Sequence, residues 1–153
     1  MLNFNNCLII GTFILLTNKQ IIMNVKNFLI GGIVGGIADF LMGWLIYGIL
    51  LKDTFPKPAD AGPENMMFIF LGCMAFGFMI SYIFAQGEGI SNYVTGIKVA
   101  AGIAFFMSLS ENFLSQMYKA TINVKLVAID LVAVLVLASV VGASIAFVNG
   151  KMK

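Results

Sequence analysis

The stretch from Phe28 to Leu51 reads FLIGGIVGGIADFLMGWLIYGILL and contains one charged residue, Asp39. A helix needs roughly 20 consecutive apolar residues to cross the hydrocarbon core of a bilayer, and this stretch is long enough. It shows no alternation of apolar and polar residues, and it is far longer than a membrane barrel strand of about ten residues. The stretch therefore predicts a transmembrane helix.

Three further apolar stretches of the same kind follow along the chain. Together they predict an all-α, polytopic membrane four-helix bundle, with helices at about residues 28–51, 66–85, 99–118 and 124–148. The segment at 52–65 carries all three prolines of the chain, as is typical of an aqueous loop. The connection at 119–123 is so short that we expect the last two helices to form an antiparallel hairpin.

The composition of the chain agrees with this fold and excludes several classes of protein. Of the 153 residues, 60% are hydrophobic and 10% are charged, whereas soluble domains are about 25% charged. There is no histidine, and every basic residue is a lysine, which removes the commonest general base, the commonest metal ligand and bidentate arginine recognition. The net charge of +2 does not indicate a nucleic-acid partner. We expect no catalytic site, no cofactor and no metal, and a lipid bilayer as the surrounding partner.

The first residues of the chain fit the bundle less well. Residues 7–16 (CLIIGTFILL) form an apolar run that is too short to span a bilayer. The run resembles the core of a signal peptide, but no basic residue precedes it and no A-x-A cleavage site follows. We prefer the alternative that translation begins at Met23. Residues 23–153 are then the four-span domain, and residues 1–22 are an extension or a short apolar helix.

Aromatic residues and lysines mark the predicted membrane boundaries. The aromatic residues near predicted helix ends, where interfacial belts form, are Trp44, Tyr47, Tyr82 and Tyr118. The lysines divide almost evenly between the two sides of the predicted bundle, so the positive-inside rule gives no clear orientation. We expect both termini to lie in the cytoplasm.

Small residues recur at a spacing of four on each predicted helix. Membrane helices associate by close backbone approach at such residues, because lipid tails are as apolar as leucine. The glycines that we expect at helix contacts are Gly31, Gly35, Gly43, Gly77 and Gly142. The simplest interpretation is that these faces meet in one compact bundle. The alternative is that the repeated GxxxG pattern of the first helix forms a homodimer seam.

Three acidic residues, Asp39, Glu111 and Asp130, lie within predicted spans. A charged residue at mid-bilayer costs at least about 2.5–3.5 kcal/mol, so each needs a partner or a function. At 1.5 Å of helical rise per residue, Glu111 lies roughly 10 Å and Asp130 roughly 9 Å from the same membrane face. We therefore expect these two carboxyls at matching depth on adjacent helices, with Asp39 deeper.

Two interpretations of these acids follow. In the first, they clip the helices together through hydrogen bonds with Ser108, Ser115, Asn112, Gln116 or tyrosine hydroxyls, in a non-enzymatic structural or partner-binding membrane component. In the second, they bind a proton or cation in a small oligomeric carrier or channel. Four helices enclose little room, so we expect such transport to need a dimer. Catalysis by a carboxylate pair is the third and weakest reading. The sequence identifies no substrate or partner.

Two segments carry a resemblance to a family of small bacterial four-helix membrane proteins of unknown function. GWLIYGILLKDTF (residues 43–55) is similar to the end of the first helix in that family, where a G-x-L-W-Y-G-P-L-F-G-K-x-W-like segment leads into the first loop. Residues 111–147 resemble its closing hairpin, with an asparagine in the third helix and an L-F-x-I-D-like start to the fourth. The matching positions are Trp44, Tyr47, Asn112 and Asp130. Ile49 replaces the expected proline, and the histidine often found early in the fourth helix is absent. The resemblance implies a four-helix fold and a bacterial inner membrane, and no activity.

Overall fold

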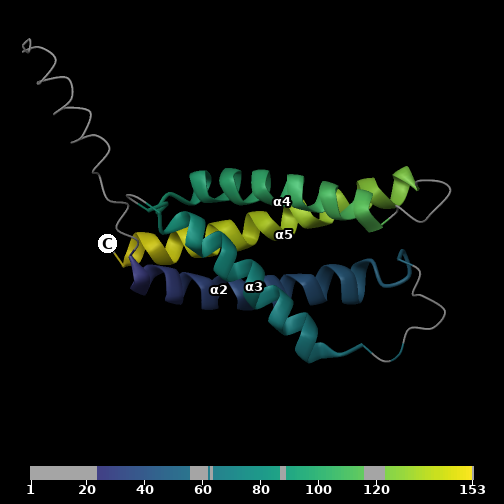
Figure 1. Ribbon diagram of the computed structural model, residues 1–153, viewed down its shortest axis with the longest axis horizontal. Helices are drawn as coiled ribbons and strands as arrows, with labels where there is room; N and C mark the ends of the chain where they lie inside the picture. The colour runs from purple at the N-terminus through teal and green to yellow at the C-terminus, as the bar shows by residue number, and fades with distance from the viewer. Residues whose placement is uncertain (1–23, 56–61, 63, 87–88, 116–122, 153) are drawn as a thin grey trace, which may run out of the picture.

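The computed structural model describes residues 24–55, 62, 64–86, 89–115 and 123–152. These residues form four long helices (Figure 1): α2 (Val25–Gly43), which continues as the π-helical segment η1 (Trp44–Leu50), then α3 (Met66–Phe84), α4 (Tyr93–Ser115) and α5 (Val124–Lys151). Each of the four is long and apolar enough to cross a membrane. The prediction of an all-α four-helix membrane protein is confirmed. Residues 1–22 and most of the 119–123 connection lie outside the described residues.

An asparagine stands at the start of every one of these helices. Its side-chain oxygen accepts a hydrogen bond from a backbone N–H of the first turn, a group that has no partner within the helix. The four caps are Asn24, Asn65, Asn92 and Asn123. Asn92 accepts from the N–H of Val94 at 2.9 Å. This cap explains why α4 begins at Tyr93, ahead of the predicted start at residue 99.

Helix α5 holds the bundle together. It packs along α4 on one side and against α2 on the other, and α3 contacts mainly α2. Figure 1 shows α4 and α5 running antiparallel, with α3 crossing α2 at an angle. The α2–α3 pair and the α4–α5 pair are therefore joined mainly by the contact of α2 with α5. As a consequence, space remains on both sides of η1, towards α3 and towards α4.

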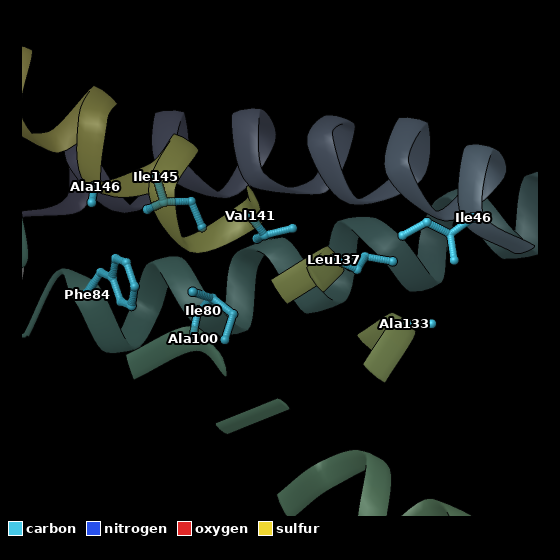
Figure 2. Packing of buried hydrophobic residues seen from close by; sticks show 9 residues of the cluster. All are labelled: Ile46, Ile80, Phe84, Ala100, Ala133, Leu137, Val141, Ile145 and Ala146. Atoms are coloured by element: carbon cyan, nitrogen blue, oxygen red, sulfur yellow. The ribbon is translucent and has the colours of Figure 1, made fainter. Parts of the chain in front are cut away.

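The buried apolar residues form a row along the bundle. Figure 2 shows the row running from Ala146 and Phe84 at one end to Ile46 and Ala133 at the other. Most of its members belong to α5, as expected for the helix with neighbours on two sides. The full cluster is Ile46, Ile80, Phe84, Ala100, Ala133, Leu137, Val141, Ile145 and Ala146.

Glycines set the closest approaches between helices. A Cβ added at Gly77 of α3 would collide with the backbone of Gly36 of α2 and would lie 2.8 Å from the carbonyl oxygen of Gly32. Helices α4 and α5 meet in the same way, because a Cβ on Gly142 would lie 2.5 Å from the carbonyl oxygen of Gly96. These two crossings therefore require glycine.

The other predicted packing glycines differ in the space that a side chain would have at each position. A Cβ on Gly31 would lie 2.6 Å from Oγ of Ser81, and one on Gly35 would lie 2.6 Å from Cδ1 of Ile145. Gly43 has room for a methyl group, since its nearest neighbour would be Leu137 at 3.7 Å. The helix widens into η1 just after Gly43, which relaxes the packing there.

The outer faces of the helices are apolar and exposed. On α2, exposed aliphatic side chains recur every four residues, at Val25, Leu29, Ile33, Ile37 and Leu41. Such a stripe suits contact with lipid and would be unfavourable in water. The GxxxG glycines of α2 lie on the opposite side and are buried within the same chain. Helices of one chain therefore fill the surface that a GxxxG homodimer seam would use.

Candidate functional site

The Asp130 carboxyl is a polar junction between three helices. Its Oδ1 accepts a hydrogen bond of 2.8 Å from the hydroxyl of Tyr47 in η1. Its Oδ2 accepts bonds of 3.1 Å from Oγ of Ser108 and 2.6 Å from Nδ2 of Asn112, both in α4. Asp130 itself belongs to α5. This network of three hydrogen bonds ties α5 to η1 and α4 at a defined register.

Local backbone structure brings these donors to Asp130. Ser108 and Asn112 are four residues apart and therefore share one face of α4. The amide of Asn112 also donates to the carbonyl oxygen of Ser108 at 2.9 Å, which fixes the orientation of the amide. Tyr47 lies in η1, where the N–H of Leu51 bonds to the carbonyl oxygen of Ile46 at 2.8 Å in the wide π pattern. Such segments are rare and often occur at functional sites.

A cavity of about 480 Å³, which we call the first cavity, opens beside this junction. It lies between α2–η1 and the α4–α5 pair, and all three carboxyls of the predicted spans line it: Asp39, Glu111 and Asp130. Each carboxyl comes from a different helix. Among the described lining residues there is no lysine to neutralise them. Within the described part of the chain, no group of three acidic, cysteine or histidine residues is placed to hold a metal ion.

Asp39 is the most enclosed of the three acids. It is 6% exposed. Its side chain accepts a hydrogen bond from the thiol of Cys73 in α3, whereas its Oδ1 is buried and has no hydrogen-bond partner among the residues that the structure describes. Asp39 also lines a second cavity of about 670 Å³, between α2–η1 and α3. Buried polar atoms are nearly always paired, so this unpaired oxygen of a carboxyl that lines two cavities calls for an explanation.

The remaining predicted site residues lie around the edges of this region. Glu111 is exposed at the first cavity, and Ser115 lines it too while donating a 3.0 Å hydrogen bond to the carbonyl oxygen of Asn112. Trp44 is half exposed and lines the second cavity. Tyr82 is half exposed near the end of α3, with its ring edge-on to Phe28. Tyr118 lies outside the described residues.

Sequence reasoning left two features of this site unseen. It named tyrosine hydroxyls as possible partners of the acids but assigned Tyr47 to the membrane interface, whereas the structure directs the Tyr47 hydroxyl to Asp130. It also gave no indication of the second cavity that Asp39 lines. The clue for the first was the position of Tyr47 on the same four-residue spacing as Asp39. The second depends on the crossing angle of α2 and α3, for which the sequence offers no signal.

Comparison with protein-family models, with curated proteins and with solved structures finds no match to this chain. The fold alone therefore defines the class of protein. By helix length and hydropathy, the chain is a multi-pass membrane protein with four candidate spans among its described residues.

Proposed function

We propose that this chain is a non-enzymatic membrane carrier that binds a proton or a monovalent cation in its first cavity. One observation carries the proposal: Asp39, Glu111 and Asp130 reach the same cavity from three helices. Acidic residues are rare inside membrane spans, and those that occur usually mark ion or proton pathways. A cavity whose described lining residues include carboxyls and no lysine attracts positive charge, and its apolar walls concentrate that attraction.

The three carboxyls have different tasks in this proposal. Asp130 already accepts three hydrogen bonds, so it holds the helices in place. Asp39 has a free oxygen deep in the bundle and binds the cation or proton. Glu111 is exposed and attracts cations towards the cavity. A cavity of this size lies within one chain, so a monomer has room for cation binding. The dimer expected from the sequence concerns transport and stays a prediction.

Ion flux in liposomes tests the carrier. The full-length chain is reconstituted with a pH-sensitive dye inside the vesicles, and a proton, sodium or potassium gradient is applied. A protonophore is added with the sodium and potassium gradients, so that movement of either cation drives a compensating proton movement that the dye reports. We expect the dye to respond faster than in empty liposomes, and Asp39→Asn to abolish the difference. Ser139→Ala is the matched control, because the hydrogen bond that Ser139 makes among the described residues lies within its own helix, to the carbonyl oxygen of Leu135. Equal responses from wild-type and empty liposomes under all three gradients would refute the carrier.

A structural or partner-binding membrane component is the second candidate function. The Asp130 network favours it, because a carboxyl that joins three helices needs no ligand to account for its place in the membrane. In that case Asp130→Asn should lower protein level and function together, and Asp39→Asn should change neither. Loss of function in Asp39→Asn at unchanged protein level would favour the carrier.

We place the protein in the inner membrane of a bacterium, with both termini in the cytoplasm. The resemblance of residues 43–55 and 111–147 to the bacterial family supports this location. The even number of candidate spans among the described residues supports a shared side, and the start of α2 and the end of α5 lie at the same end of the bundle (Figure 1). A C-terminal alkaline phosphatase fusion should be inactive, and a C-terminal green fluorescent protein fusion should be bright. The reverse result would invert the orientation.

A further inference from the structure

The second cavity differs in chemistry from the first. Helices α2 and α3 touch at Gly36 and Gly77, and Figure 1 shows them diverging from there towards η1 and the start of α3. The cavity of about 670 Å³ occupies this widening space. Its size falls within the range of about 300–1,000 Å³ that is typical of small-molecule sites.

Aromatic rings and one buried carboxyl line this second cavity. Phe40, Trp44, Tyr47 and Phe55 contribute the rings. The rings of Tyr47 and Phe55 pack with centroids 5.9 Å apart, which gives one wall a fixed aromatic surface. Asp39 lies among them with its unpaired Oδ1. Aromatic faces attract organic cations, most strongly where water is excluded, and a carboxylate supplies the opposite charge.

We propose that the second cavity binds an organic ammonium ion, with Asp39 as its counter-ion and Trp44 as its main aromatic contact. This inference rests on the proposed carrier function and names the class of its substrate. An inorganic cation would gain little from the aromatic walls. A neutral apolar molecule would leave the Asp39 oxygen unpaired. An ammonium ion with an apolar substituent satisfies both features of the cavity.

Asp39 also lines the first cavity, so one carboxyl serves both sites. The titratable groups that face this region are Tyr47 from η1, Cys73 from α3, Glu111 from α4, Asp130 from α5, and Lys52 and Glu64 at the loop end of the second cavity. A proton on Asp39 removes the counter-ion for ammonium. Binding of the ammonium ion therefore displaces that proton, and the two cations exchange at one site.

Calorimetry on full-length protein in lipid nanodiscs tests this site. The probe is benzyltrimethylammonium, with its uncharged carbon isostere neopentylbenzene as competitor and empty nanodiscs as the blank. We expect saturable binding of one ammonium ion per chain, no displacement by the isostere, and a proton released on binding. The apparent Kd should rise up to about tenfold per pH unit as the medium becomes acidic enough to protonate Asp39.

Variants separate the roles of the two residues. Asp39→Asn should abolish binding. Trp44→Leu should weaken it roughly tenfold, whereas Trp44→Phe, which keeps an aromatic face, should restore most of the affinity. Phe106→Leu is the control, because Phe106 is an exposed aromatic residue of α4 outside the cavity lining. Elution of each variant at the wild-type volume in detergent shows that it folds.

The outcomes distinguish this inference from the carrier proposal. Absence of saturable binding, or binding that is unchanged in Asp39→Asn and Trp44→Leu, would overturn the ammonium site even where ion flux in liposomes persists. Saturable binding that is lost in Asp39→Asn and weakened in Trp44→Leu supports the site. If that binding occurs without any ion flux, the carrier fails and the site stands.

Discussion

The hydroxyl of Tyr47 donates a hydrogen bond of 2.8 Å to Oδ1 of Asp130, across 83 positions of the sequence. This bond connects the end of the first span to the beginning of the last. Because Oδ2 of the same carboxyl accepts from Ser108 and Asn112, Asp130 links η1, α4 and α5 through one side chain. Tyr47 lines the first and the second cavity, and Asp130 lines the first. The bond between them therefore fixes part of the wall of each cavity.

Removal of the Tyr47 hydroxyl should weaken this junction. In Tyr47→Phe the ring remains against Phe55 while the bond to Asp130 is lost. We expect the free energy of unfolding to fall by about 0.5–1.5 kcal/mol, the usual net contribution of such a bond. The measurement is SDS titration in detergent micelles, followed by the fluorescence of Trp44, the single tryptophan of the chain.

The control for this prediction is Tyr82→Phe. Tyr82 is half exposed on α3 and takes part in a ring contact with Phe28 that the substitution preserves. We expect a change within about 0.5 kcal/mol. Equal effects of the two substitutions would show that the hydrogen bond of Tyr47 does not stabilise the fold.

The crossing of α2 and α3 should tolerate no methyl group at Gly77. In Gly77→Ala the new Cβ would meet the backbone of Gly36, which cannot move aside as a side chain would. We expect a loss of at least about 1–3 kcal/mol, the range for overpacking. Gly72→Ala on the same helix is the matched control, because a Cβ at Gly72 meets nothing within 4 Å. Comparable stability of the two variants, in the same SDS titration, would contradict this account of the crossing.

Much of the fold could be predicted from hydropathy, and the reason is physical. Each span must satisfy its own backbone within the bilayer, so an apolar run of sufficient length becomes a helix whatever its neighbours are. The runs at 28–51 and 66–85 accordingly agree with the helical ranges Val25–Leu50 and Met66–Phe84. Helix α4 starts earlier than predicted because Asn92 caps it ahead of its apolar run. Hydropathy does not register this local signal.

The site was only partly accessible to the same reasoning. Depth along a helix follows from helical rise, so Glu111 and Asp130 were expected on the same level, and both line the first cavity. The π-helical turn of η1 and the divergence of α3 from η1 depend on tertiary packing. The four-residue spacing places Tyr47 on the same helix face as Asp39, but it does not identify Asp130 as its partner. The position of Asp39 between two cavities follows from the tertiary packing, and no sequence period encodes it.

The asparagine caps should stabilise the helices where they begin. In Asn92→Ala the N–H groups of Val94 and Thr95 lose their side-chain acceptor. We expect a loss of about 1 kcal/mol, within the range of about 0.5–2 kcal/mol known for such caps. Asn92→Asp should retain the stability, because its carboxylate can accept the same bonds and favours the positive end of the helix. Unchanged unfolding of Asn92→Ala in micelles would show that water replaces the cap.

The buried Asp39 and the partly buried Asp130 should respond differently to substitution. Asp130→Ala leaves three donors without their acceptor, so we expect a loss of about 1–3 kcal/mol in the free energy of unfolding. Asp39→Asn removes an acid whose Oδ1 has no partner among the described residues. We expect no loss of stability from it, and a gain of up to about 1 kcal/mol, because binding residues are commonly kept at a cost in stability.

This contrast separates a structural acid from a binding acid without an assay of activity. SDS titration of both variants, with Glu111→Gln as an exposed comparison, ranks the three variants by their free energy of unfolding. Destabilisation by Asp39→Asn as large as that by Asp130→Ala would mean that Asp39 supports the fold, and would remove the argument that its free oxygen is kept for a ligand. Stability retained in Asp39→Asn, together with lost ion flux, is the result that a binding site between two cavities requires.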